Sequence, residues 1–182
     1  MNRDANLQGR IWVLTDPRGR LIEDIDTDQI FHNAHLHITE TAEMGPHALG
    51  NLEGWENFAP EVQAGDLVFA GRNFGAGSSR QQAVGCFIAL GIGLIAAPSF
   101  GAIYFRNAVN SGFPLLELPE LPDLSARGVL QTGDRVQVEL DAGEAHNVSR
   151  GIDFFFKPIT GVQLDIWRAG GLFAYARRFA GG

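Results

Sequence analysis

Short hydrophobic runs separated by polar turns dominate the pattern along the first two thirds of the chain. Four of them, residues 9–14, 67–71, 93–97 and 113–118, are mostly apolar over lengths typical of strands. Apolar runs of four to eight residues between turn signals predict strands that are buried on both faces. We therefore expect a central sheet whose strands have little exposed surface.

Two helices are expected between the last three of these strands. Residues 81–90 place apolar side chains at helical spacing and end at Gly91, a favourable C-terminal stop. Residues 100–109 predict a second helix, with Ser99 as its N-cap. A strand–helix–strand–helix–strand order predicts parallel strands joined by right-handed crossovers.

The pattern changes after this region. Residues 133–140 alternate apolar and polar positions, as a half-buried strand does, and residues 152–157 predict one more strand. A less regular stretch separates them. Residues 164–179 indicate a C-terminal helix interrupted by two glycines at 170–171, whereas residues 40–64 lack periodicity and suggest a surface excursion with short helical turns. We expect one α/β domain over residues 1–182, with a mostly parallel central sheet and a small β-subdomain.

Composition narrows the class of protein. The 182 residues are 45% hydrophobic and 19% charged, which fits a globular chain with a proper core. A net charge of −7 argues against a nucleic-acid partner, which would require a basic face. No apolar run approaches the roughly 20 residues of a membrane helix. Residues 1–6 are too polar for a signal peptide, so a cytoplasmic location without membrane contact is expected.

The chain has a single cysteine, Cys86. One thiol cannot form an internal disulfide, and iron–sulfur clusters are normally held by three or four thiolates. Cys86 also falls on the apolar face of the predicted helix 81–90, which favours core packing. We expect no metal or cofactor to be bound by this chain.

The turn between the predicted strand 67–71 and the predicted helix 81–90 is the strongest candidate site. Gly75 and Gly77 permit positive φ angles, and Ser78, Ser79 and Arg80 follow at the expected helix start. Amide donors, the helix dipole and a guanidinium would together hold a carboxylate there and lower the pKa of a serine hydroxyl. An ordinary capped helix, with a serine as N-cap and the arginine in solvent, fits the same spacing.

Acidic and histidine residues cluster just after the first strand. The carboxylates of Asp24, Asp26 and Asp28 lack the glycine and glutamate of a calcium loop, so turn-forming or solvated roles are expected. The histidines at positions 32, 35 and 37 have no recognised zinc spacing. We expect loop histidines that contact solvent or a substrate rather than a metal site.

Several motifs match one known family in order along the chain. They are Asp24–Ile30 (Asp-Ile-Asp-Thr-Asp-Gln-Ile), the stretch 65–83 that includes Gly75-Ala76-Gly77-Ser78-Ser79-Arg80, residues 100–112 and residues 169–172. Together they resemble the small subunit of 3-isopropylmalate dehydratase, which is equivalent to the swivelling fourth domain of aconitase. The resemblance implies an aconitase-type swivelling β/β/α domain and a hydro-lyase that is active only with a large subunit.

The resemblance also implies roles for individual residues. Ser78 would be the base that removes or returns the proton next to a substrate carboxylate, and Ser79 and Arg80 would hold that carboxylate. Asp28 would lie at the same site. The partner, in a heterodimer or heterotetramer, would be a large subunit carrying a [4Fe–4S] cluster whose open iron acts as a Lewis acid.

One segment departs from the family pattern. Small subunits usually read Ile-Pro-Ala-Arg-Tyr-Leu where this chain has Phe31-His32-Asn33-Ala34-His35-Leu36. The loop contributes to recognition of the substrate side chain in the family, so His32 and His35 are candidate substrate-binding residues. The resemblance favours 2-isopropylmalate, converted to 3-isopropylmalate in leucine biosynthesis.

Two alternatives stay open. One is another hydroxy-acid substrate, such as homocitrate, a methylated malate or citrate. The other, from a different class, is a non-catalytic module that binds a partner or an anion through the same fold. The intact Ser78-Ser79-Arg80 motif weighs against this second alternative.

Overall fold

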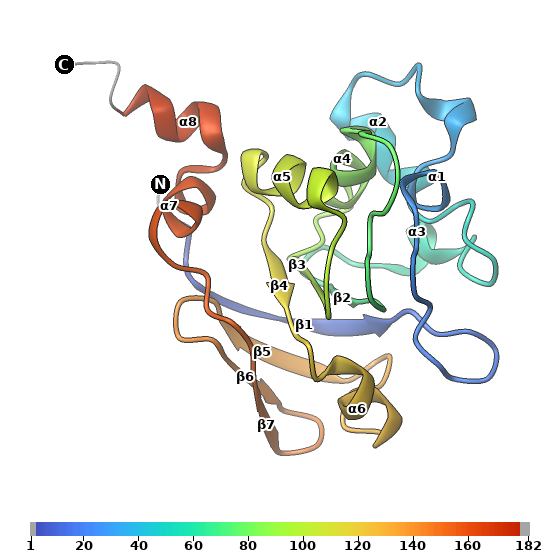
Figure 1. Cartoon of the computed structure of the whole chain (residues 1–182), viewed down its shortest axis with the longest axis vertical. Coiled ribbons are helices and arrows are strands. Elements are labelled where there is room, and N and C mark those ends of the chain that lie inside the picture. Colours follow the sequence, from blue (N-terminus) through green and yellow to red (C-terminus); the bar gives the residue numbers. More distant parts are fainter. Residues whose placement is uncertain (1–2, 179–182) are drawn as a thin grey trace.

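A seven-stranded mixed sheet forms the centre of the computed structural model, which describes residues 3–178 (Figure 1). The strand order is β4-β3-β2-β1-β5-β6-β7. The parallel half contains β1 (Asn6–Val13), β2 (Leu67–Phe69), β3 (Leu94–Ala97) and β4 (Leu115–Glu117). The antiparallel half contains β5 (Arg135–Glu139), β6 (Glu144–Asn147) and β7 (Ile152–Phe155). The predicted parallel strands are thus confirmed, and the small β-subdomain corresponds to the antiparallel half.

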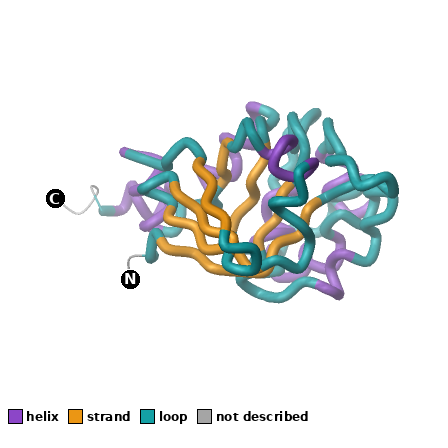
Figure 2. Tube along the Cα trace, turned by 90° about the horizontal axis from the view of Figure 1, so that it is seen from below, coloured by secondary structure: helices purple, strands orange, loops and turns teal. Residues whose placement is uncertain are grey.

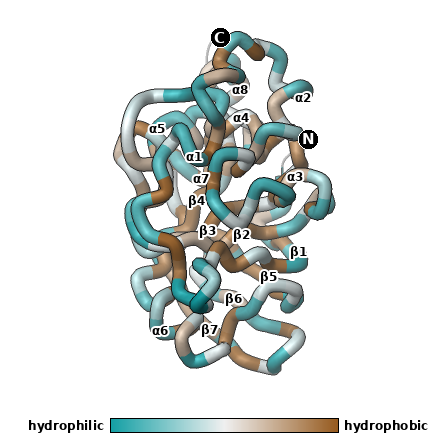
Figure 3. The backbone as a smooth tube through the Cα atoms, turned by 90° about the vertical axis from the view of Figure 1, so that its right-hand side faces the viewer, coloured by the Kyte–Doolittle hydropathy of each residue, from teal (hydrophilic) through white to brown (hydrophobic). Residues whose placement is uncertain are grey.

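Both faces of the parallel half are buried, because neighbouring residues along each strand point to opposite sides. On β2, Val68 belongs to one hydrophobic core, while Leu67 and Phe69 belong to the other. The hydrophobic segments accordingly run through the middle of the molecule (Figure 3). Burial on both faces explains why these strands read as continuous apolar runs in the sequence.

The sheet curls so that its antiparallel half covers one face of its parallel half. Phe69 on β2 packs edge-on against Phe154 on β7, with ring centroids 6.4 Å apart, although three strands separate β2 from β7 in the sheet. Val136 and Val138 of β5 join the same core. This curl leaves the opposite face of the parallel strands for helices.

Helices complete both cores, with the strands gathered between them (Figure 2). The helices α4 (Gln82–Ala89) and α5 (Ala102–Asn110) contribute to the core on the helical face, and α6 (Leu121–Ala126) and α7 (Gly161–Ala169) contribute to the core beneath the curl. The last helix of the described chain is α8 (Leu172–Arg177). None of the helices within residues 3–178 combines the length and apolar character needed to cross a membrane.

Short helices occupy the segment after β1. They are α1 (Thr27–Ile30), η1 (Asn33–His35), α2 (Thr41–Met44), η2 (Gly45–His47) and α3 (Phe58–Glu61). The expected surface excursion at 40–64 is wrong in part, because Leu49, Leu52 and Phe58 are buried in the core on the helical face. This segment therefore closes one side of the core rather than merely lying on it.

Several element predictions need correction. The helix α6 and the strand β6 were not expected, and β1 begins at Asn6 rather than at residue 9. Ser99 does not cap α5, whose N-cap is Gly101; its hydroxyl instead accepts a hydrogen bond from the Asn73 amide at 3.0 Å. The predicted C-terminal helix is broken at the two glycines as expected, begins at Gly161, and its last expected residue, Phe179, lies outside the described residues.

Candidate active site

Two loops from distant parts of the sequence meet at the predicted site. Asp26 caps α1: its carboxylate accepts hydrogen bonds from the amides of Asp28 and Gln29, and the Gln29 side chain accepts one from the Asp26 amide. Thr27 then joins α1 to the other loop, since its amide donates to the Ala76 carbonyl at 2.9 Å and its hydroxyl to the Ser78 carbonyl at 3.0 Å. These bonds fix the turn 75–80 against α1.

Glycine is required at position 75 for two reasons. Its φ angle is +77°, and a Cβ atom there would lie 2.2 Å from Cγ of the buried Tyr104. Gly77 also has a positive φ, +92°, as the sequence predicted. The turn thus packs closely against Tyr104 of α5, and residues 77–79, which follow Ala76, are exposed.

Arg80 forms the central ion pair of the site. Its Nη1 donates to the Asp28 Oδ1 at 2.7 Å and to the Phe31 carbonyl at 3.0 Å, and only 11% of its side chain is exposed. The hydrogen bond from this guanidinium is the main reason that the pKa of Asp28 lies below its usual value. The alternative in which Arg80 points into solvent is therefore wrong.

Asp28 is held by more than Arg80. The Asn33 amide donates to Oδ1 at 3.0 Å, and the Asn51 side chain donates to Oδ2 at 3.1 Å. Asn51 was not predicted, because it lies in an aperiodic segment 23 residues away. The carboxylate is therefore oriented by three different loops.

The two serines lie at the exposed end of this arrangement. Ser78 and Ser79 are both exposed, and the Asn107 side chain on α5 donates to the Ser79 hydroxyl at 3.2 Å. Neither serine caps a helix, because α4 begins only at Gln82 and its N-cap, Gln81, makes no side-chain capping bond. The predicted helix 81–90 is confirmed to within one residue at each end, but the two serines precede its first turn, so the capped-helix alternative is wrong.

Two of the predicted histidines lie close to His47, which the sequence did not single out. His35 stacks on His47 with ring centroids 3.9 Å apart and planes 26° from parallel, and His32 lies edge-on to His35 at 6.3 Å. Burial, followed by the nearby imidazoles, lowers the pKa of His35. His37 is exposed and bonds the Ala34 carbonyl at 3.0 Å. No group of three or more potential ligands among residues 3–178 is arranged to hold a metal ion.

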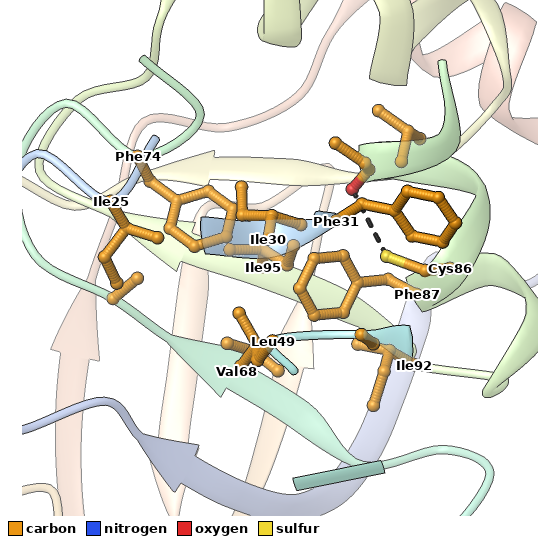
Figure 4. Packing of buried hydrophobic residues seen from close by; sticks show 14 of the residues in the cluster. Ile25, Ile30, Phe31, Leu49, Val68, Phe74, Cys86, Phe87, Ile92 and Ile95 are labelled. Carbon is orange, nitrogen blue, oxygen red and sulfur yellow. Dashed lines mark hydrogen bonds between the residues drawn. The ribbon is translucent and has the colours of Figure 1, made fainter. Parts of the chain in front are cut away.

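Cys86 does not fit the role of an iron ligand. It is fully buried on α4, where its thiol contacts the Ala83 carbonyl (Figure 4). Burial raises the pKa of the thiol far above its ordinary value, whereas a ligand must be a thiolate. The described residues therefore do not fit an iron–sulfur cluster.

Comparisons with known proteins agree on the class. The aconitase C-terminal domain family matches residues 24–121. The chain is similar to the 3-isopropylmalate dehydratase small subunit of Aquifex aeolicus, with 36% identity over 93% of this chain and 94% of that one, and to that of Moorella thermoacetica, with 37% identity over 85% and 89%. A crystal structure of 3-isopropylmalate dehydratase from Methanocaldococcus jannaschii superimposes with a TM-score of 0.82 at 30% identity, covering 96% of this chain and 95% of that one.

The chain therefore belongs to the aconitase C-terminal domain family. Within that family it groups with the small subunits of 3-isopropylmalate dehydratase, which are hydro-lyase subunits. The expected fold class and family are confirmed.

Proposed function

We propose that this chain is the small subunit of a hydro-lyase that isomerises a 2-hydroxy acid of the malate type by dehydration and rehydration. The names of the relatives make conversion of 2-isopropylmalate to 3-isopropylmalate, a step of leucine biosynthesis, the leading activity. The chain supplies the base and the residues that bind a substrate carboxylate. A large subunit supplies the acid for the departing hydroxide.

In this proposal Ser78 acts on the carbon next to a substrate carboxylate. Its hydroxyl oxygen, deprotonated in the complex, takes the proton from that carbon, and the electrons of the broken C–H bond form a double bond as hydroxide leaves the neighbouring carbon. Return of water to the other carbon gives the isomer. Arg80 and Ser79 hold the carboxylate, and Asp28 orients the guanidinium.

The observation that carries the proposal is that one turn presents an exposed serine and, two residues later, an arginine whose orientation is fixed. Ser78 is exposed on a turn that is fixed to α1 through the hydroxyl of Thr27. Two residues further on, the Arg80 guanidinium is fixed by Asp28 and the Phe31 carbonyl. A preorganised cation beside a reactive group is the arrangement expected where negative charge develops on a substrate.

The remaining parts belong to the proposed partner. We infer a large subunit that carries the [4Fe–4S] cluster, which would act as the acid for the departing hydroxide. This division fits a small subunit whose one thiol is buried and protonated. We place the complex in the cytoplasm, whose reducing conditions suit a chain with a free thiol.

The test is Ser78→Ala in a complex reconstituted with a cluster-bearing large subunit. Loss of a general base lowers kcat by roughly 10²- to 10⁴-fold, so we expect hydration of isopropylmaleate to fall at least about 100-fold. Ser125→Ala, on the distant α6, is the matched control. Gel filtration should show that both variants assemble with the large subunit. Near-full activity of the assembled Ser78→Ala complex would remove Ser78 from this role.

A further inference from the structure

Three loops that follow neighbouring parallel strands lead to the candidate site. The loop after β1 enters α1, which carries Asp28, and the loop after β2 carries Ser78 and Arg80. The loop after β3 enters α5, whose Asn107 donates to Ser79. The geometry of the site therefore depends on how these three loops are held relative to one another.

Asn73, on the middle loop, is hydrogen bonded to both of the others. Its side-chain amide donates to Oδ1 of Asp24, on the loop after β1, at 2.8 Å. Its backbone amide donates to the hydroxyl of Ser99, on the loop after β3, at 3.0 Å. The carbonyl of the preceding residue, Arg72, also accepts a hydrogen bond from the Asp24 amide at 2.8 Å. One asparagine thus connects all three loops.

The two residues joined by the side-chain bond share an unusual backbone conformation. The φ angles of Asn73 and Asp24 are +57° and +54°, and only three non-glycine residues among residues 3–178 have a positive φ. Asparagine and aspartate adopt this conformation more readily than other non-glycine residues do. Asn73 precedes Phe74 and Asp24 precedes Ile25, and both of these hydrophobic residues are buried in the core on the helical face (Figure 4). The bond therefore joins two turns at which the chain enters the core.

The two loops stay in contact from this bond as far as the site. Beyond Asn73, the Gly75 amide donates to the Ile25 carbonyl at 2.8 Å. The contacts between the loops continue to the ion pair of Arg80 with Asp28, at 2.7 Å. The side-chain bond of Asn73 lies at one end of this series and the ion pair at the other. A displacement of the middle loop at Asn73 would therefore change the placement of the arginine relative to its carboxylate partner.

We propose that Asn73 is a positioning residue for the hydro-lyase reaction and that it acts through its hydrogen bond to Asp24. It holds the loop after β2 between its two neighbours and so sets the placement of Ser78, and of Arg80 relative to Asp28. The inference rests on the proposed function, which assigns the reaction to this turn. It adds to the site two residues that do not touch the substrate.

The test exchanges the donor and the acceptor of this bond. Asn73→Asp keeps a residue that tolerates positive φ, but it removes the donor and places a second carboxylate beside Asp24. Adding Asp24→Asn to the same chain restores one donor and one acceptor with their positions exchanged. In the reconstituted complex, we expect Asn73→Asp to lower kcat/KM for isopropylmaleate hydration roughly ten-fold, the effect of one lost hydrogen bond, and the double variant to recover to within about three-fold of the wild type.

Glu23→Gln is the matched control. Glu23 precedes Asp24 and lies 3.9 Å from Arg72 across the same two loops, with 53% of its side chain exposed. Exposed ion pairs contribute little, so kcat/KM should stay within about two-fold of the wild type. Urea unfolding checks that each variant is folded. Wild-type kcat/KM in Asn73→Asp, or no recovery in a folded double variant, would overturn the inference.

A measurement on the isolated chain separates this inference from the proposed function. The hydrogen bond from Arg80 lowers the pKa of Asp28, so displacement of the middle loop should raise that pKa towards its ordinary value. We expect NMR titration of the Asp28 carboxyl group to show this rise in Asn73→Asp and in Asn73→Gly, but not in Glu23→Gln. Glycine accepts positive φ without strain, so Asn73→Gly removes the side-chain bond alone and introduces no charge.

The two readouts have distinct consequences. An unchanged pKa of Asp28 in both Asn73 variants would overturn the inference, even if the activity of the complex fell. A raised pKa in both variants, together with no turnover of any hydroxy acid by the wild-type complex, would support the positioning of the loop and contradict the proposed function alone.

Discussion

At the scale of single residues, Arg80 has both a structural role and a proposed role in substrate binding. Its Nη1 already donates to Asp28 and to the Phe31 carbonyl. A substrate carboxylate would bind to the remaining donors of the guanidinium, which are fixed in direction by these two contacts. The ion pair therefore sets the orientation of the arginine before any ligand arrives.

Arg80→Lys should consequently weaken substrate binding more than it alters the charge. Lysine keeps the positive charge but lacks the planar set of donors, so we expect KM to rise roughly ten-fold or more in the reconstituted complex. Arg72→Lys is the matched control, because Arg72 lies on the same loop with 63% of its side chain exposed. Equal KM values for the two variants, measured by steady-state kinetics, would contradict a carboxylate-binding role for Arg80.

Asp28 should make stability depend on pH in the acid range. Its hydrogen bond with Arg80 lowers its pKa in the folded chain below the ordinary value of 3.8, so the unfolded chain binds the proton more readily. The stabilisation is complete above about pH 4 to 5 and is lost as the pH falls through the lowered pKa. In Asp28→Asn, the free energy of unfolding measured in urea should decrease less steeply between pH 5 and pH 2. If the free energy of unfolding falls equally steeply between pH 5 and pH 2 in the two proteins, that result would argue against this ion pair.

At the scale of elements, the turn 75–80 depends on its close approach to α5. Gly75 and Gly19 have nearly equal φ angles, +77° and +76°, but a Cβ atom would meet Tyr104 at position 75 and nothing within 4 Å at position 19. The two sites therefore separate crowding from backbone conformation.

Gly75→Ala should destabilise the chain by about 1–3 kcal/mol more than Gly19→Ala, since overpacking adds to the shared cost of positive φ. Urea unfolding of the two variants measures the difference directly. Gly75→Ala should also lower activity in the complex, because the displaced turn carries Ser78. A similar loss of stability in both variants would mean that the turn can move away from Tyr104 without cost.

The elements that the sequence predicted best are those with a strong local pattern. The strands β2, β3 and β4 and the helices α4 and α5 were predicted to within a few residues, because burial on both faces or on one helical face leaves a periodic signal. The strand β6 (Glu144–Asn147) was missed, since Glu144 and His146 are on its outer side and its pairing with β5 and β7 is set by tertiary contacts.

The residues of the candidate site also fall into two groups, those that a motif identifies and those that only the tertiary structure brings to the site. The turn with Ser78 and Arg80, and the carboxylate of Asp28, could be identified from motifs, but the contact between Arg80 and Asp28 spans 52 residues and has no local signature. His47 and Asn51 could not be found, because the segment 40–64 shows no periodicity although its core residues are buried. Their position follows from how that segment packs onto the core.

At the scale of the whole molecule, the proposed function requires a partner subunit. Its described residues hold no arrangement of potential ligands for a metal ion. The relatives with which it groups are named small subunits, a name that implies a larger partner.

The purified chain should therefore contain no stoichiometric iron and show no hydro-lyase activity alone. Mixing it with a cluster-bearing large subunit should restore activity in proportion to the complex formed, as followed by gel filtration and an isopropylmaleate hydration assay. Iron analysis of the isolated chain gives an independent readout. Stoichiometric iron or turnover without a partner would contradict the division of labour proposed above.

The lone cysteine has a practical consequence. Because Cys86 is completely buried on the core-facing side of α4, a colourless disulfide reagent that turns yellow on reaction with a thiol can reach it only when the surrounding core opens. The rate of colour development in the isolated chain therefore reports how often that half of the molecule opens under native conditions. The single thiol thus serves as a native probe of local opening, and no label has to be introduced.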